Sequence, residues 1–367
     1  MVTQKKKSSK TPDGRAPVSE PELDHRKNSI LGTVVYEYIA TGEPVGSSTL
    51  TQKYNLGISP ATVRAELASL DEEGYLDQPH TSAGRVPSDR GYRYYVDHLM
   101  LPEILTQEER DRIRAEVRRA AHQLDSVVDH ASHVLSNLTR SIAFAIRPRL
   151  SSQIFRHIEL IRVGARATHV VLVTNLGLAA QATIETGQEA DADQLLRATN
   201  AFNQHLHGMP LVEISVANLQ SLAREAPLPE DLIRAIAGIL AEHTGADAEH
   251  RLFAGGAHNL LDQQEFRDLR KLRAILDLLE EQQTLYTLLH GSLQTEGPTV
   301  AIGHELPNAD MSECSVVTVP YKVGNSNAGA VGILGPRRMQ YARLIALIDG
   351  MADSLNALFQ GEQELDR

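Results

Sequence analysis

One short segment near the start of the chain has residue types suited to reading DNA bases. The spacing predicts a helix over residues 59–73, with Ser59 as N-cap and Pro60 at the first helical position. Its inward stripe is formed by Val63, Leu67 and Leu70. The opposite face is small and lightly polar with one cation, and consists of Ala61, Thr62, Arg64, Ala65, Ala68 and Ser69. Small side chains allow close approach to base edges, so we expect Arg64 to contact guanine or a phosphate, and Thr62 a thymine methyl or a phosphate.

Two neighbouring segments supply candidates for phosphate contact. A short helix is expected over 47–54 with Ser47 as its N-cap, and it places Ser47, Ser48 and Lys53 where a helix crosses the DNA backbone. Such contacts position a protein without specifying sequence. A β-hairpin is expected over 75–87, with a tip formed by Thr81, Ser82, Gly84 and Arg85. An arginine on a flexible tip suits the negative potential of a minor groove.

The elements around these residues predict a winged helix-turn-helix domain over 23–100. A helix starts at Leu23 and ends at Gly42 and Pro44, with an apolar stripe of Ile30, Leu31, Val34, Val35, Tyr38 and Ile39. A turn over 55–58 offers Gly57 for a positive φ. A further helix follows Ser88 and includes three tyrosines, Tyr92, Tyr94 and Tyr95. Winged helices also serve as protein-interaction modules, so spacing alone leaves that alternative open.

The charge distribution removes an objection to DNA binding. The chain has a net charge of −11, but its first hundred residues hold 12 Lys and Arg against 13 Asp and Glu. The remaining residues hold 24 and 34, so the acidic excess lies outside the proposed DNA-binding domain. Residues 1–22 are expected to form a disordered tail, whose lysines Lys5, Lys6, Lys7 and Lys10 either touch DNA nonspecifically or are simply solvated.

Beyond residue 100 the pattern predicts an α+β domain interrupted by an insertion. One long helix is expected over 106–146, with a heptad seam that packs either on a second chain or on its own domain. Strands are expected within 157–186 and at 211–216, 299–304, 315–323 and 328–334. Helices are expected over most of 191–243, over 265–290 and after Arg337. The expected division is one domain over 101–190 and 285–367, with 191–284 inserted.

Several long motifs, in this order, resemble the HrcA family. Gly46–Leu50 and Ile58–Arg64 are similar to its helix-turn-helix, and Leu70–Leu76 continues the match. His80–Pro87 is similar to its wing, and Gly91–Asp97 to the segment after it. Downstream, the interrupted α+β pattern resembles the family's GAF-like domain with an inserted dimerisation domain.

This resemblance implies a cytoplasmic repressor of heat-shock chaperone operons. It implies a homodimer bound to double-stranded DNA at an inverted-repeat CIRCE operator, with activity that depends on a GroEL-type chaperonin. An inverted repeat requires a two-fold protein, and the seam in 106–146 and the helices around 191–290 are the candidate interfaces. No cofactor or metal is implied.

Other function classes have weaker support in the sequence. No GxxxxGK[ST] or HExxH motif is present, and Gly329, Gly332 and Gly335 lack dinucleotide-binding spacing. The lone Cys314 excludes an internal disulfide and fits a core position better than a nucleophile. His130 and His133 share a helix face, which is more typical of solvated residues than of a metal site. No signal peptide or membrane span is expected, and a ligand-sensing GAF-like domain remains the alternative.

Overall fold

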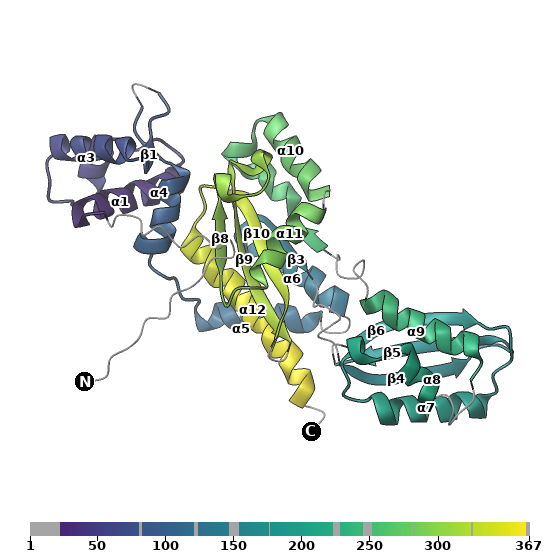
Figure 1. Cartoon of the computed structure of the whole chain (residues 1–367). Helices are drawn as coiled ribbons and strands as arrows, with labels where there is room; N and C mark the ends of the chain where they lie inside the picture. Colours follow the sequence, from purple (N-terminus) through teal and green to yellow (C-terminus); the bar gives the residue numbers. More distant parts are fainter. Residues whose placement is uncertain are drawn as a thin grey trace, which may run out of the picture. The chain divides into compact units, whose positions relative to one another are not determined.

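The computed structural model describes residues 23–80, 83–120, 124–146, 154–175, 177–222, 228–244, 252–280, 282–323 and 326–364. The chain divides into two compact units, one ending at Met100 and one starting at Leu101. The fold is α+β, with helices and antiparallel sheets (Figure 1). The expected tail over 1–22 lies outside the described residues.

The described residues of the first unit form four α-helices, a two-stranded hairpin and a π-helical turn. Its elements are α1 (His25–Thr41), α2 (Ser47–Lys53), α3 (Pro60–Glu72), β1 (Leu76–Asp77), β2 (Val86–Pro87), α4 (Asp89–Tyr94) and the π-helix Tyr95–Leu99. The core is formed by the apolar stripes of α1 and α3 together with buried aromatic rings, and Tyr75 meets Tyr94 edge to face at 5.4 Å. The expected helices and hairpin of this unit are thus confirmed.

Local signals explain where these helices begin and end. The Ser59 hydroxyl accepts the amide of Thr62 at the start of α3, as predicted. Gly42 ends α1 with φ 73°, and Gly57 in the turn before α3 has φ 66°, a region that favours glycine. One prediction was wrong: Ser47 is the first residue of α2, and the N-cap is Gly46.

The second unit contains a five-stranded antiparallel sheet. Its strands, in the order β7-β3-β10-β9-β8, are β7 (Leu252–Gly255), β3 (Ile142–Ile146), β10 (Ser326–Pro336), β9 (Cys314–Val323) and β8 (Thr299–Ile302). Gly332 in β10 allows Phe144 to pack closely, because a Cβ there would lie 2.9 Å from its ring. The late glycines therefore serve strand packing.

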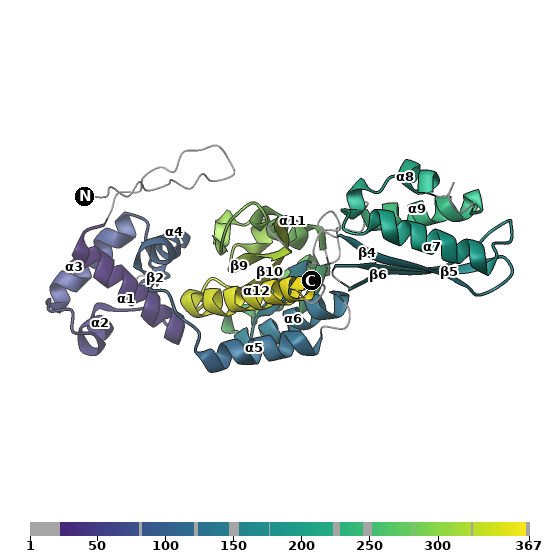
Figure 2. The same cartoon turned by 90° about the horizontal axis from the view of Figure 1, so that it is seen from below.

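Helices cover both faces of this sheet (Figure 2). One layer consists of α5 (Gln107–Arg119), α6 (Leu124–Thr139) and α12 (Tyr341–Glu364). The other consists of α10 (Leu269–Glu280) and α11 (Gln282–Ser292), whose leucines share a core with Phe144 and Val316. The result is a three-layer α-β-α arrangement.

A second core in this unit belongs to a three-stranded sheet. Its strands are β4 (Phe155–Arg162), β5 (Ala167–Thr174) and β6 (Gly177–Glu185), and its helices are α7 (Ala192–Leu206), α8 (Val216–Leu222) and α9 (Glu230–Thr244). In β5, buried residues alternate with half-buried ones. The buried side chains of the sheet share a core with the helices, for example Phe155 and Leu172 with Phe202. Among the described elements, the helices lie on one face only (Figure 2).

Three expectations for this unit differ from the structure. The segment 106–146 is two helices and a strand, and its seam residues Ile113, Val117 and Ala131 are buried where α5, α6 and α12 pack together. The seam therefore packs on its own unit. Residues 211–213 form a 3₁₀ turn, not a strand. The expected border at residue 191 also falls inside one hydrophobic core, because β4–β6 pack with α7–α9.

The first residues of the second unit are joined to helix α12 by ion pairs. Arg343 of α12 pairs with Glu109 and, at 3.1 Å, with Glu103. Hydrogen bonds from the Arg343 guanidinium and from the backbone amide of Thr106 lower the pKa of the Glu109 carboxyl to about 2, from its ordinary 4.5. A carboxyl group whose pKa is lowered by folding contributes its full stabilisation at pH values above its unfolded-state pKa.

We therefore expect acid to weaken this attachment over a defined window. The stabilisation from Glu109 should be complete above pH 4.5 and be lost as the pH falls toward about 2. The measurement is the thermal midpoint of wild type and Glu109→Gln between pH 7 and pH 3. The difference between them should shrink below pH 4.5, whereas a constant difference would contradict the assignment.

Candidate DNA-binding surface

The exposed face of α3 has the composition that the sequence predicts. Ala61, Arg64 and Ala65 are exposed, while Val63, Leu67 and Leu70 are buried against the rest of the first unit. Within the described part of the chain, Arg64 has no ion pair, so its guanidinium is available to a ligand. Thr62 is half-buried, and its hydroxyl lies 2.9 Å from that of Ser59. The face is therefore small, open and singly charged.

Helix α2 places its polar residues at its two ends. Ser47 is half-buried and Ser48 is exposed in the first turn. Lys53, the last residue, pairs with the buried Glu37 of α1, which sequence reasoning missed. The second oxygen of Glu37 accepts the hydroxyl of Tyr54 at 2.7 Å. The hydrogen bonds from Lys53 and Tyr54 lower the pKa of the Glu37 carboxyl. Burial, together with the hydrogen bond to Glu37, raises the pKa of the Tyr54 hydroxyl to about 12.

The hairpin differs from expectation at Arg85. Its side chain is only 16% exposed, and its guanidinium pairs with Asp71 of α3 at 3.1 Å. The backbone amide of Val45 donates to the carbonyl of Arg85 at 2.8 Å, and the amide of Arg85 donates to the carbonyl of Val45 at 2.9 Å. Arg85 is therefore an anchor at the base of the hairpin and not an exposed tip residue. Thr81 and Ser82 lie outside the described residues.

Gly84 allows the hairpin to approach the segment before α2. A Cβ at residue 84 would lie 2.5 Å from the carbonyl carbon of Val45, which is closer than any relaxed contact. We expect Gly84→Ala to displace the hairpin and weaken DNA binding while the core of the unit stays folded. Gel shifts and near-UV circular dichroism would check this, with Gly46→Ala as control, since a Cβ there meets only Ser48 at 3.7 Å.

Other candidate sites have less support. His130 and His133 lie 3.5 and 3.7 Å from carboxylate oxygens of Glu116 and Asp129, and the described residues include no group of three or more potential metal ligands. Burial raises the pKa of the Cys314 thiol to about 12, which makes it a poor nucleophile. No helix among the described residues is long and apolar enough to cross a membrane.

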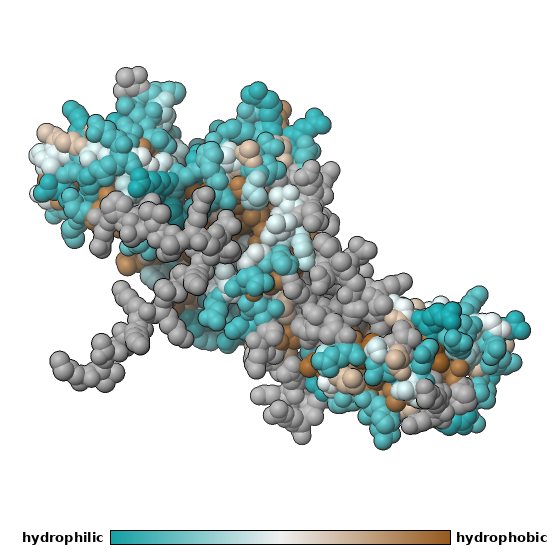
Figure 3. Space-filling model, in the orientation of Figure 1, coloured by the Kyte–Doolittle hydropathy of each residue, from teal (hydrophilic) through white to brown (hydrophobic). Residues whose placement is uncertain are grey.

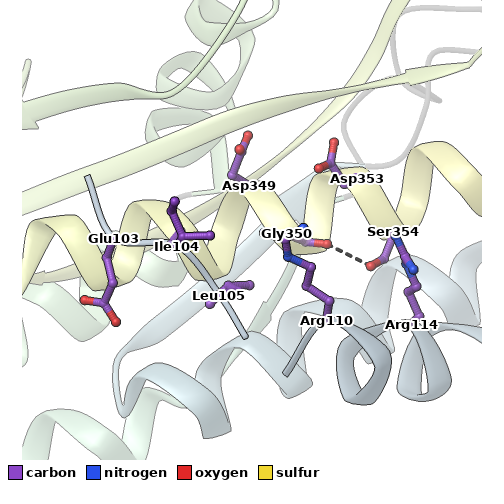
Figure 4. A pocket seen from close by; sticks show the side chains of 10 residues that line it. Glu103, Ile104, Leu105, Arg110, Arg114, Asp349, Gly350, Asp353 and Ser354 are labelled. Carbon is purple, nitrogen blue, oxygen red and sulfur yellow. Dashed lines mark hydrogen bonds between the residues drawn. The ribbon is translucent and has the colours of Figure 1, made fainter. Parts of the chain in front are cut away.

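A cavity of about 260 Å³ lies between the segment 103–105, α5 and α12. Figure 4 shows Arg110 and Arg114 of α5 near Gly350 and Ser354 of α12, with Glu103 and two aspartates at its edges. Pockets for small molecules are mostly apolar, so this charged lining assigns no ligand.

An open helix face with a hairpin beside it is typical of DNA-binding transcription regulators. Comparison with known proteins gives the family. A family model described as the HrcA protein C-terminal domain matches residues 125–345. The heat-inducible transcription repressor HrcA of Symbiobacterium thermophilum is 37% identical over 92% of this chain and 98% of its own length. That of Pelotomaculum thermopropionicum is 36% identical over 92% and 97%.

The chain belongs to the HrcA family of heat-inducible transcription repressors. A crystal structure of a hypothetical protein has a similar fold, with a TM-score of 0.61 and 24% identity. That likeness covers 93% of this chain and 100% of the other.

Proposed function

We propose that this protein is a heat-inducible transcription repressor that binds DNA through a winged helix-turn-helix in its first unit. The exposed face of α3 carries this proposal, because Ala61 and Ala65 let the helix approach base edges and Arg64 supplies a bidentate donor. Ser47, Ser48 and Lys53 of α2 contact phosphates, and Ser59 and Thr62 reach the backbone from the start of α3. Thr81, Ser82 and Arg85 belong to the wing, where Arg85 sets its position.

The operator is an inverted repeat of the CIRCE type, read by a homodimer. A two-fold protein presents one α3 to each half-site. The three-stranded sheet supports this arrangement, because one face lacks helices among the described elements. This face exposes Ile161 of β4 and includes the half-buried Val171 and Val173 of β5. In this proposal the three-layer domain of the second unit is GAF-like, and the sheet β4–β6 with its helices is the inserted dimerisation domain.

A GroEL-type chaperonin maintains the active form. Figure 3 shows apolar residues on the visible surface, and the exposed ones in the second unit include Leu101 at 83%, Ile104 at 77% and Leu269 at 78%. Exposed apolar surface is a common feature of protein-interaction sites. If the purified protein stays soluble and binds DNA equally well with and without chaperonin, this part of the proposal fails.

The proposal is tested by gel shifts of the full chain on a CIRCE inverted repeat and on a scrambled duplex of equal length, across a salt series. We expect tighter binding to the inverted repeat, with affinity falling steeply as salt rises. Equal affinity for both duplexes at every salt concentration would contradict sequence-specific repression.

A further inference from the structure

A buried carboxylate lies beneath the last turn of α2. Glu37 of α1 is 6% exposed, yet it is held as a charged group by Lys53 and by the Tyr54 hydroxyl. A buried carboxylate is costly unless such partners satisfy it. Both partners belong to the C-terminal end of α2, so the site joins α1 to α2 at one point.

This contact helps to fix the position of helix α2, which also packs against α3. It has seven residues, and Leu50 is the one buried side chain among them. A helix this short is not stable by its own hydrogen bonds. Leu50 holds its middle, and Glu37 holds its C-terminal end through Lys53 and Tyr54.

The same contact affects how much positive charge a phosphate meets. The Lys53 side chain is 55% exposed, so its ammonium remains reachable. An ammonium has three donors and can bind Glu37 and a phosphate together. However, the Glu37 charge offsets part of the Lys53 charge felt by the phosphate. Attraction to phosphates is independent of sequence, so offsetting it weakens nonspecific binding more than base reading.

We propose that Glu37 is a positioning residue for DNA binding, which fixes the end of α2 and limits the nonspecific attraction that Lys53 exerts on phosphates. This inference rests on the proposed function. The wing has a parallel arrangement, because Arg85 pairs with Asp71. Three cations are thus placed on this surface: Lys53, Arg64 and Arg85. Lys53 and Arg85 are paired with carboxylates, whereas Arg64 on the exposed face of α3 has no such partner among the described residues.

The test uses the full chain on an unrelated duplex and on the CIRCE repeat over a salt series. Glu37→Gln keeps an oxygen for the Tyr54 hydroxyl but removes the charge. We expect several-fold tighter binding to the unrelated duplex and a salt slope steeper by up to about 0.9 per subunit. Glu37→Asp should restore the wild-type slope, and adding Lys53→Gln to Glu37→Gln should abolish the gain. Glu72→Gln, an exposed site on α3, controls for the change in net charge.

Two results would overturn the proposal. One is a salt slope of DNA binding that is the same for Glu37→Gln as for Glu72→Gln. In that case Glu37 has a purely structural role, even if Glu37→Gln has a lower thermal midpoint than wild type. If Glu37→Gln does not fold, the Lys53→Gln variant alone decides. Its salt slope should fall by well under about 0.9 per subunit, whereas a drop of about 0.9 per subunit would show that Glu37 does not offset the Lys53 charge. If wild type shows no preference for the repeat, the proposed function fails instead.

Discussion

Replacing Arg64 with Ala is expected to weaken binding to the CIRCE repeat by about 5- to 150-fold per half-site and to relax specificity at one base pair of each half-site. A bidentate arginine contact to guanine is worth about 1–3 kcal/mol of discrimination. Arg64 is exposed on α3 and forms no ion pair among the described residues, so the substitution removes no salt bridge that the structure describes. The measurement is anisotropy titration on the repeat and on single-base variants of each half-site.

Arg64→Lys serves as the matched variant. It keeps the charge but loses the planar fork, so it should retain affinity for unrelated DNA while losing base discrimination. If Arg64→Ala instead weakens binding equally on every duplex, Arg64 contacts phosphate only. Unchanged affinity on all duplexes would remove Arg64 from the surface.

Gly91→Ala is expected to be the most damaging small substitution in the first unit. Gly91 is buried in α4, and a Cβ there would lie 2.0 Å from the carbonyl oxygen of Tyr75. That oxygen also accepts the amide of Ser88, so α4 cannot move without breaking the hairpin end. Forced overpacking of this kind costs about 1–3 kcal/mol, which lowers the thermal midpoint of a small domain by roughly 4–8 °C per kcal/mol.

Tyrosine signals make this unit observable separately. The chain has no Trp and ten Tyr, and most of these lie before residue 100: Tyr36, Tyr38, Tyr54, Tyr75, Tyr92, Tyr94 and Tyr95. Near-UV circular dichroism therefore follows mainly the first unit. Gly32→Ala in α1 is the control, because its Cβ would meet Leu99 at an ordinary 3.7 Å and alanine favours a helix. A midpoint equally low in both variants would contradict the steric argument.

The sequence predicted those parts of the surface that depend on local signals. The N-cap Ser59, the Pro60 after it and the three-and-four spacing of Val63, Leu67 and Leu70 define α3 without any distant contact. The same spacing also placed Ala61 and Arg64 on the outer face. The α+β class followed from the order of strand-like and helix-like segments, and the later strands followed from local runs of apolar residues such as 315–323 and 328–334.

Contacts between distant residues were not predictable in this way. Arg85 looks like a tip residue in the hairpin, and only the fold brings Asp71 within 3.1 Å of it. Glu37 looks like a surface residue of α1 until α2 covers it. The apolar spacing through Ile113 and Val127 continues past Arg119, so it gave no sign that α5 ends there. The spacing also did not reveal what buries the seam, because a seam buried by neighbouring helices looks the same as one buried by a second chain.

Thiol cross-linking tests most directly whether the exposed face of α3 lies against DNA bases. The chain has one cysteine, Cys314, which is fully buried, so a cysteine introduced at Ala65 would be the reactive thiol. We predict that Ala65→Cys forms a disulfide with a CIRCE duplex whose half-site carries a thiol-tethered base in the major groove. Ser29→Cys, exposed on α1, should not react, nor should Ala65→Cys with a scrambled duplex. Equal cross-linking of both cysteines, or none from residue 65 under conditions where the repeat is bound, would contradict DNA reading by α3.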